Sequence, residues 1–298
     1  MTIATSPAST TKLPRRRNPI LAFLGAQPLG AIGLVIIIAM GLSALLANLL
    51  APYDPLSPDY GSMLAAPNRE HWFGTDQYGR DILSRVMYGA RTALAIGFFS
   101  SALGCSIGAL IGAISGYAGG RTDMIIQRFI DIILAFPIII LAMVVVAIVG
   151  KRQVAGIDTN LILAIAIPIV PKLARIARAS TLSIASMPYI DAARANGFSH
   201  TRIVLRHILP NIMAPFIVMF TAFIAQAILL EASLSFLGVG VTEPTPAWGL
   251  MLGEGSADLY RRAPWVIIFP GVAISLAVFA FNLFGDSLRD WLDPKMKG

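Results

Sequence analysis

Long apolar runs separated by short polar stretches are the main feature of the chain. The first covers residues 29–50 and contains no charged residue. A helix needs about 20 apolar residues to cross the hydrocarbon core of a bilayer, so this run is long enough to span it. Comparable runs lie at residues 92–117, 125–149, 161–179, 212–230 and 265–285. The pattern predicts an all-α polytopic membrane protein with six transmembrane helices.

The fourth run has the weakest pattern of the six. Its uncharged part ends at Pro171, and it reaches spanning length only by continuing through Lys172, Arg175 and Arg178. Cations three residues apart stay near one helix face. We interpret this end as leaving the bilayer into the cytoplasm, with the long side chains reaching the interface.

Composition supports a membrane protein. Apolar residues make up 56% of the 298 residues and charged residues only 13%. Soluble domains carry about a quarter charged residues, and disordered chains are rich in charge and poor in apolar residues, so both classes are excluded. The single cysteine, Cys105, lies in an apolar run, which excludes an internal disulfide and predicts a small buried hydrophobe.

The distribution of charge predicts the orientation of the spans. If the N-terminus is inside, the cytoplasmic segments carry +9 and the outer segments −2 of the net +7, in agreement with the positive-inside rule. This asymmetry explains the positive charge without a nucleic-acid partner. We expect both termini in the cytoplasm and a tail at residues 1–28. The transmembrane domain then covers residues 29–298, with 51–91 and 231–264 outside and 180–210 inside.

Small residues form a regular face in the second run. Gly104, Gly108, Gly112 and Gly116 recur every four residues and therefore lie on one helix face, where a neighbouring helix can approach closely. We favour packing inside the chain over a subunit interface, which the sequence leaves open. Prolines that can kink a helix lie within or at the ends of the runs, at Pro137, Pro168, Pro171, Pro215 and Pro270.

Ionisable residues inside the runs are scarce. Asp131 lies near the inner end of the third run, where we expect a helix-end contact with Arg128, and Glu231 lies at the outer end of the fifth. The histidines lie outside the runs or at their ends, at His71, His200 and His207. Ion-driven carriers usually place a carboxylate or histidine deep in the bundle, so this distribution disfavours that class. No metal site is expected from so few, scattered histidines.

The cytoplasmic stretch 180–210 has the signals of helix, glycine turn and helix. Ser186 is predicted to cap the first helix, with Pro188 in its first turn and Asp191 near its positive end. Gly197 suits a left-handed helix end, and Ser199 can cap a second helix that ends at Pro210. The small residues near the turn, Ala192, Ala193 and Ala195, suit docking to another protein. The alternative is an amphipathic element held at the membrane surface by Arg202 and Arg206.

Two outer stretches also carry polar patterns. Asp76, Arg80, Asp81 and Arg85 alternate in sign at spacings of four, which favours ion pairs on the surface of a helix. This helix either lies near the mouth of a pore or rests, solvated, on the membrane. Pro244, Pro246 and Trp248 predict a stiff outer loop with an interfacial aromatic, which touches a partner or packs against the chain's own spans.

Three motifs resemble a known family. The pattern from Asp191 through Gly197 to Leu209 and Pro210 resembles the EAA loop of permease subunits of ABC-type importers, with Asp191 for the usual glutamate and His207 for the usual isoleucine. The segments HWFGTDQYGRDILSRVMYGARTAL and LLEASLSFLGVGVTEPTPAWGLML resemble signatures of the dipeptide/oligopeptide/nickel permease family, specifically its second, C-type permease. The terminal FNLFGDSLRDWLDPK also fits, so the resemblance covers residues 29–294.

The resemblance implies a type I importer fold in the bacterial cytoplasmic membrane. It implies a B-type permease as the pairing subunit, two P-loop ATPases inside, which bind ATP and Mg, and an extracytoplasmic solute-binding protein. The loop would couple to the ATPases through Asp191, Ala192, Ala193, Gly197, Leu209 and Pro210. No catalysis and no cofactor are expected in this chain, where the phosphate-binding pattern G-x-x-x-x-G-K-[ST] does not occur.

The resemblance implies dipeptides or oligopeptides as substrates. Nickel, glutathione or another small solute is the alternative, since the binding protein sets most of that choice. A self-contained secondary carrier is a second class, but the sequence contains no convincing internal repeat and no deep carboxylate. A membrane enzyme ranks last, because neither H-E-x-x-H nor a catalytic serine–histidine pattern occurs within the spans.

Overall fold

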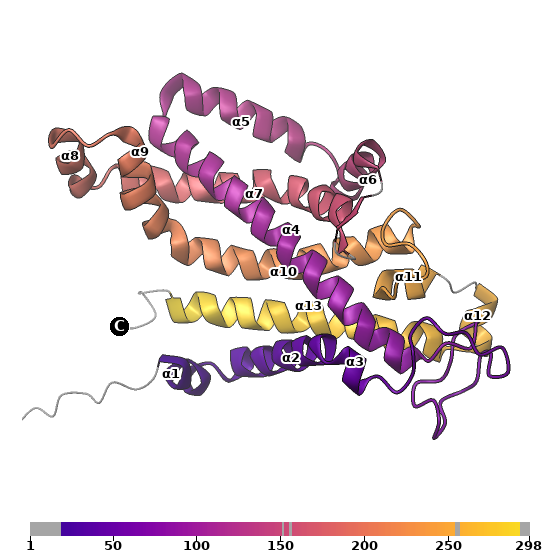
Figure 1. Ribbon diagram of the computed structural model, residues 1–298. Helices are drawn as coiled ribbons and strands as arrows, with labels where there is room; N and C mark the ends of the chain where they lie inside the picture. The colour runs from indigo at the N-terminus through magenta and orange to yellow at the C-terminus, as the bar shows by residue number, and fades with distance from the viewer. Residues whose placement is uncertain (1–18, 151, 155–156, 254–256, 293–298) are drawn as a thin grey trace, which may run out of the picture.

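The computed structural model describes residues 19–150, 152–154, 157–253 and 257–292, and helices dominate these ranges (Figure 1). The helices are α1 (Pro19–Ala26), α2 (Pro28–Leu45), α3 (Ala47–Leu50), α4 (Ile82–Ala118), α5 (Gly120–Leu134), α6 (Ile138–Val149), α7 (Thr159–Ala185), α8 (Pro188–Ala195), α9 (His200–Ile203), α10 (Met213–Phe236), α11 (Trp248–Gly253), α12 (Ala257–Arg262) and α13 (Trp265–Leu292). A π-helical segment, η1 (Val204–Ile208), and a 3₁₀ segment, η2 (Leu209–Ile212), join α9 to α10. Two short strands, β1 (Gln153–Val154) and β2 (Ile157–Asp158), pair antiparallel between α6 and α7.

The prediction of six spans is confirmed, with one span broken. In the described ranges five helical stretches are long and apolar enough to cross a membrane: α2, α4, α7, the run His200–Phe236 that ends in α10, and α13. The sixth consists of α5 and α6 together, which meet at an angle of 93°.

The expectation of one continuous helix over residues 125–149 is therefore wrong. Pro137 lies directly before α6 with an extended backbone (φ −57°, ψ 131°). Proline has no amide hydrogen to donate, and it disfavours helical geometry at the residue before it. The helix consequently ends at Leu134 and restarts at Ile138 in a new direction.

Several spans extend beyond their apolar runs. The helix α4 has 37 residues and begins at Ile82, ten residues before the predicted span. The helix α7 continues to Ala185, well past the three cations taken as its exit from the bilayer. Hydropathy marks only the part of a helix that matches the bilayer, whereas the helix itself continues while its polar side chains find partners.

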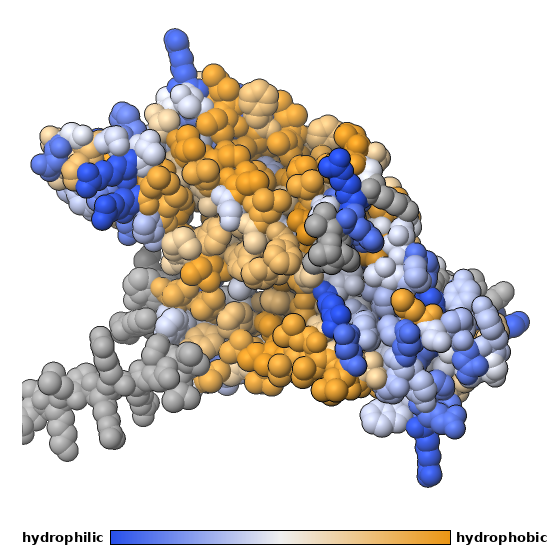
Figure 2. Space-filling model, in the orientation of Figure 1, coloured by the Kyte–Doolittle hydropathy of each residue, from blue (hydrophilic) through white to orange (hydrophobic). Residues whose placement is uncertain are grey.

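The spans pack around α4, which crosses the middle of the bundle (Figure 1). It packs most extensively against α7, and also against α10 and α2, while α13 packs between α2 and α10. Outward-facing apolar side chains, such as Leu45 and Ile148, are more than 70% exposed. They form the hydrophobic belt between two polar ends in Figure 2, as expected where lipid replaces water.

The glycine face of α4 lies against α7. A Cβ added at Gly104 would be 2.8 Å from the Ala166 carbonyl oxygen, and one added at Gly108 would be 2.6 Å from that of Val170. Gly112 and Gly116 meet the backbone of α7 in the same way, at Ala174 and Arg178. The face is thus used inside the chain, and Cys105 on the same helix is fully buried, as predicted.

The two ends of the bundle carry different elements. Figure 1 places α1 and the C-terminal end of α13 toward the end that carries α8. The opposite end carries α11, α12 and the irregular segment 51–81. This arrangement agrees with an even number of crossings between the two described ends.

Candidate functional site

The polar segment between α7 and α10 contains the predicted short helix, here α8. Pro188 opens α8 and Asp191 lies in its first turn, where a negative charge is favoured. The predicted cap is wrong: Met187 holds the N-cap position, and the Ser186 hydroxyl donates a hydrogen bond to the Ser183 carbonyl at 2.9 Å. Because α7 extends to Ala185, Ser186 instead holds the C-cap position of α7.

Gly197 ends α8 in the left-handed conformation that its position predicts, with φ +74°. Its amide donates to the Arg194 carbonyl at 2.9 Å, and the Phe198 amide donates to the Ala193 carbonyl at 3.1 Å. These two bonds form a Schellman motif, which satisfies the last carbonyls of the helix. An added Cβ at Gly197 would meet nothing within 4 Å, so a substitution there would strain the backbone rather than clash.

One face of α8 is buried and the other is free. Ile190 and Ala193 point into the protein and are buried, whereas Asp191, Ala192 and Ala195 are exposed. Of the remaining residues of the EAA-like pattern, Gly197 and Pro210 are exposed and Leu209 is half-buried. The exposed part of α8 carries the two alanines and Asp191 together with Tyr189 and Arg194, and is accessible to another protein.

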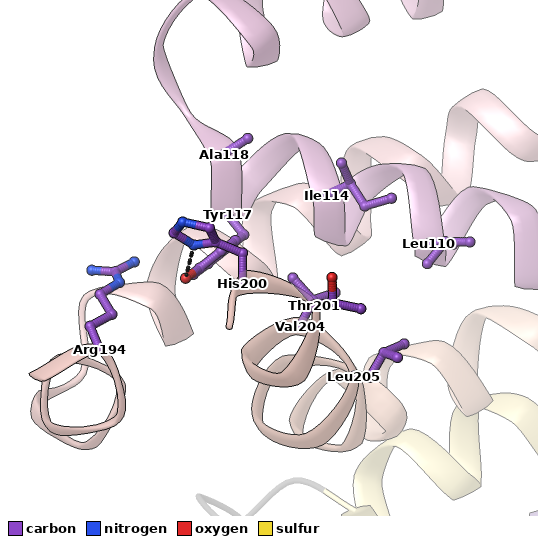
Figure 3. Close-up of a pocket in the computed structure, with 9 residues that line it drawn as sticks. All are labelled: Leu110, Ile114, Tyr117, Ala118, Arg194, His200, Thr201, Val204 and Leu205. Carbon is purple, nitrogen blue, oxygen red and sulfur yellow. Dashed lines mark hydrogen bonds between the residues drawn. The ribbon is translucent and has the colours of Figure 1, made fainter. Parts of the chain in front are cut away.

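A pocket of about 600 Å³ separates α8 and α9 from the end of α4 (Figure 3). Leu110 and Ile114 of α4 form its apolar side, and Val204 and Leu205 lie opposite. The polar contacts at its rim connect the elements. The Tyr117 hydroxyl is 2.9 Å from Nδ1 of His200, and the Arg194 guanidinium lies 5.2 Å from the Tyr117 ring centroid. The ion pair of Arg194 with Asp191, at 3.1 Å, extends this chain of contacts to the exposed face of α8.

The second half of the segment is continuous with α10. Ser199 caps α9 as predicted, accepting a hydrogen bond from the Arg202 amide at 3.3 Å. The predicted stop at Pro210 is wrong, because η1 and η2 carry the helical run through this residue into α10. The π and 3₁₀ turns accommodate the missing proline donor. Phe198 supports the junction by stacking on His207, with ring centroids 6.0 Å apart.

Ion pairs attach α7 to the broken span. Arg178 donates to Asp123 of α5 through Nε at 2.6 Å and Nη2 at 2.5 Å, and Arg175 donates to Asp131 at 2.5 Å. Asp131 therefore pairs with Arg175, and not with Arg128 as expected from the sequence. The arginines therefore face carboxylates on α5, and the interpretation that this end of α7 reaches the membrane surface stays a prediction.

Lys172 makes a contact that sequence reasoning missed. Its ammonium donates to the Gln226 side-chain oxygen on α10 at 3.2 Å. The two residues are 54 positions apart, and the spacing of the cations along α7 gives no sign of this contact. The signal that the sequence did offer is Lys172 itself, the first of the three cations, which lies in the middle of α7.

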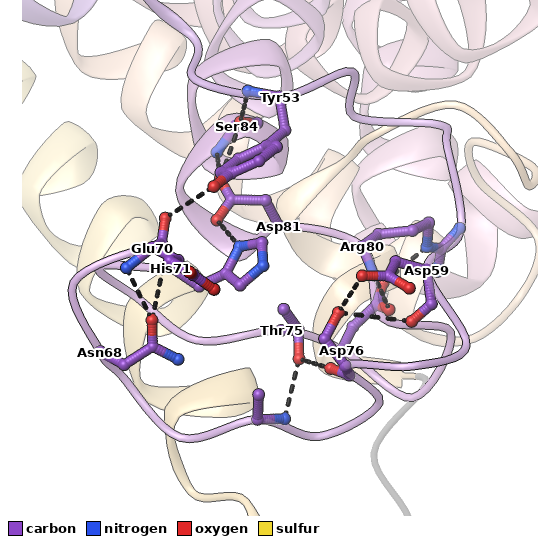
Figure 4. Close-up of polar contacts among 12 residues, drawn as sticks. Tyr53, Asp59, Asn68, Glu70, His71, Thr75, Asp76, Arg80, Asp81 and Ser84 are labelled. Carbon is purple, nitrogen blue, oxygen red and sulfur yellow. Dashed lines mark hydrogen bonds and ion pairs between the residues drawn. The ribbon is translucent and has the colours of Figure 1, made fainter.

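The outer segment 51–81 is held by buried polar contacts (Figure 4). His71 Nδ1 lies 2.9 Å from the Asp81 carboxylate, which also caps α4 by accepting from the Ser84 amide at 2.8 Å. Asp76 accepts from Nε of Arg80 at 2.6 Å. The four charged residues predicted to lie on an exposed helix, Asp76, Arg80, Asp81 and Arg85, are each less than 5% exposed. That prediction is wrong, because α4 begins only after Asp81 and the loop folds over these side chains.

The same contacts join two outer loops distant in sequence. Glu243 accepts from Arg80 at 2.8 Å and from Arg85 at 3.4 Å. Trp248 is 1% exposed and donates from its indole nitrogen to the Val86 carbonyl at 2.9 Å. Of the two alternatives for this loop, packing against the chain's own helices is therefore the one observed for Trp248.

Two family models match the chain. Residues 108–298 match the binding-protein-dependent transport system inner membrane component. Residues 24–67 match the N-terminal transmembrane domain of oligopeptide transport permease C. The first covers Gly108, Gly112 and Gly116 of the glycine face, the broken span, α8 and α10.

Curated relatives and one solved structure agree with this assignment. The chain is 45% identical to the dipeptide transport system permease protein DppC of Alkalihalophilus pseudofirmus, over 92% of this chain and 88% of that protein. It is 46% identical to the glutathione transport system permease protein GsiD of Escherichia coli, over 86% and 82% respectively. The inward-facing MetNI methionine ABC transporter shares the fold, with a TM-score of 0.54 at 19% identity over 71% of this chain and 98% of that one. The chain thus belongs to the family of binding-protein-dependent inner membrane transport components and is an ABC importer permease.

Proposed function

We propose that this permease forms half of the pathway of an ATP-driven importer of dipeptides or oligopeptides. The dipeptide permease named above, matched along most of both chains, supports the substrate class. In this proposal a second, B-type permease completes the pathway and an extracytoplasmic binding protein delivers the solute. Two P-loop ATPases bind ATP and Mg²⁺ at the cytoplasmic end, and this chain contributes no catalytic group.

The exposed face of α8 carries the proposal. It offers Asp191, Ala192 and Ala195 to a partner, while its buried face is anchored by Ile190. At Ala192 and Ala195 a groove on an ATPase can approach the helix backbone closely, because these side chains are small. The residues assigned to this contact remain Asp191, Ala192, Ala193, Gly197, Leu209 and Pro210. Of these, Ala193 lies on the buried face of α8 and supports the contact from behind.

The connections of α8 suggest how its motion would reach the pathway. Only two residues separate α7 from α8, and the helical run on the far side of Gly197 continues into α10. A displacement of α8 therefore acts on two spans directly. ATP binding shifts the equilibrium between inward- and outward-facing states only through contacts that differ between those states. In this proposal those contacts are made at α8.

The substitution Gly197→Asp tests the coupling role. An aspartate must adopt φ near +74° there and adds a charge to the docking surface, so ATP-driven uptake should be lost. The measurement is uptake of a labelled dipeptide into proteoliposomes that contain the full assembly. Membrane insertion of the variant should match that of the wild type.

Gly238→Asp is the matched control. Gly238 has φ +77° and also has nothing within 4 Å of an added Cβ, but it lies at the opposite end, beyond α10. Uptake should largely survive in this variant. Wild-type uptake by Gly197→Asp, or equal loss in both variants, would contradict a specific coupling role.

Glutathione import is the second candidate, because the glutathione permease of Escherichia coli matches the chain at 46% identity. Competition separates the two candidates. Excess unlabelled glutathione should leave dipeptide uptake unchanged if peptides are the substrates. Efficient competition, with labelled glutathione itself accumulated, would favour the second candidate.

A further inference from the structure

We propose that Lys172 and Gln226 form a site within the membrane for the carboxylate of the transported solute. The proposal rests on the proposed function in one respect, namely that this permease forms half of the pathway, and it places α7 and α10 on the side that faces the solute. It adds the residues that contact the solute and the chemical group they recognise.

Position is the first reason. Lys172 lies near the middle of α7 and Gln226 near the middle of α10, and both side chains are half-buried. A cation at this depth is costly in a bilayer. Such residues face a cavity or the bundle interior, pair with other groups, and mark the paths of solutes.

Charge is the second reason. The two arginines that follow on α7 each face a carboxylate, Asp131 for Arg175 and Asp123 for Arg178. For Lys172 the contact found among the described residues is a neutral amide oxygen, with no carboxylate in salt-bridge range there. An ammonium has three donors, and the bond to Gln226 uses one of them. The positive charge is therefore not neutralised locally.

The surroundings are the third reason. Lys172 lines a cavity of about 180 Å³ where α5 and α6 meet at their bend, with Pro168 and Pro171 from its own helix. The other lining residues are apolar, among them Phe136 and Ile138 on the two sides of the break. Lys172 is the one charged residue among those that line this cavity, whose lining is otherwise apolar.

A carboxylate is the group that fits these observations. It would accept a charge-assisted hydrogen bond from the ammonium, which is stronger than the bond to the amide oxygen it replaces. The Gln226 side chain, released from Lys172, carries two N–H donors of its own that can bind the same carboxylate. The C-terminal carboxylate of a dipeptide meets this requirement, whereas a peptide amide does not.

Binding to the permease–ATPase assembly, without the solute-binding protein, tests the site directly. The probes are dialanine and dialanine amide, which differ in the carboxylate. The wild type should bind the acid about ten-fold more tightly, as expected for one hydrogen bond to a charged group. Equal binding of the two probes, or no binding of dialanine, would overturn the proposal without any variant.

Three variants separate recognition from a structural clamp. Lys172→Met should abolish the preference for the acid, and Lys172→Arg should retain it because the charge remains. Gln226→Met breaks the contact between α7 and α10 and removes the two amide donors but keeps the cation, so the preference for the acid should weaken without being lost. A preference for the acid in Lys172→Met, or its equal loss in the methionine variants of Lys172 and Gln226, would overturn the assignment.

Uptake by the complete wild-type assembly is measured in parallel. ATP-driven dipeptide uptake without any preference for the acid in binding would overturn the carboxylate site alone. No uptake, with a preference for the acid that depends on Lys172, would overturn dipeptide import and leave the carboxylate site standing.

Discussion

At the scale of residues, contacts decide what each charged side chain does. Asp81 accepts from the Ser84 amide at the start of α4 and lies beside His71, so one carboxylate both begins a span and fastens the outer loop. Asp59, on the same segment, is exposed, and its carboxylate accepts hydrogen bonds within its own turn, from the Gly61 amide and the Ser62 hydroxyl. Its neighbours at this turn lower the pKa of Asp59, with the Ser62 hydroxyl as the largest cause.

Asp81→Ala should destabilise the permease by about 1–3 kcal/mol, because it removes a helix cap and leaves buried partners unpaired. The measurement is the thermal unfolding midpoint of the purified protein in detergent. Asp59→Ala is the control and should shift the midpoint little, since surface changes usually stay within about 0.5 kcal/mol. Equal shifts for the two variants would count against the role assigned to Asp81.

At the scale of elements, close approach of backbones holds α4 to α7. The glycines of α4 face carbonyl oxygens of α7, so even one methyl group between the helices has no room. Helices in membranes associate largely through such contacts, because lipid is as apolar as the helix surface. Glycine elsewhere has a different role: Gly41 in α2 has nothing within 4 Å of an added Cβ.

Gly108→Ala should therefore lower stability by about 1–3 kcal/mol, the usual cost of overpacking. The new Cβ would meet the Val170 carbonyl oxygen at 2.6 Å and the Leu173 Cβ at 3.0 Å. Gly41→Ala, the same change in open space, should be neutral or stabilising by up to about 1 kcal/mol. Thermal unfolding in detergent measures both variants, and a stable Gly108→Ala protein would contradict close packing at this point.

At the scale of the whole molecule, the two ends of the bundle carry different elements. One carries the exposed face of α8 close to the described chain ends (Figure 1). The other carries the segment 51–81, which the ion pair of Arg80 with Glu243 joins to the loop before α11. Charge asymmetry in the sequence predicts that α8 lies in the cytoplasm. Labelling from either side of the membrane, in intact cells and in inverted membranes, tests this orientation.

Single cysteines labelled with a membrane-impermeant maleimide report that orientation. Ala195→Cys on α8 should react in inverted membranes but not in intact cells, and Ser57→Cys on the outer segment should do the reverse. The native Cys105 is fully buried and should react in neither, which makes the unaltered protein the blank. Labelling of Ala195→Cys from outside would reverse the topology and remove α8 from the reach of cytoplasmic ATPases.

Much of this protein follows from sequence alone, because its main signals are local. Apolar runs determined the number of spans, the spacing of Gly104 and its companions determined a packing face, and Gly197 determined a helix end. Each depends on the backbone or on the solvation of a short segment. What only the tertiary structure decided depends on residues far apart in the chain: the partners of Arg175, Arg178 and Lys172, the burial of the outer charges, and the direction of the break at Pro137. A charged side chain is placed by the opposite charge or amide that folding brings near it, and local spacing does not identify that partner.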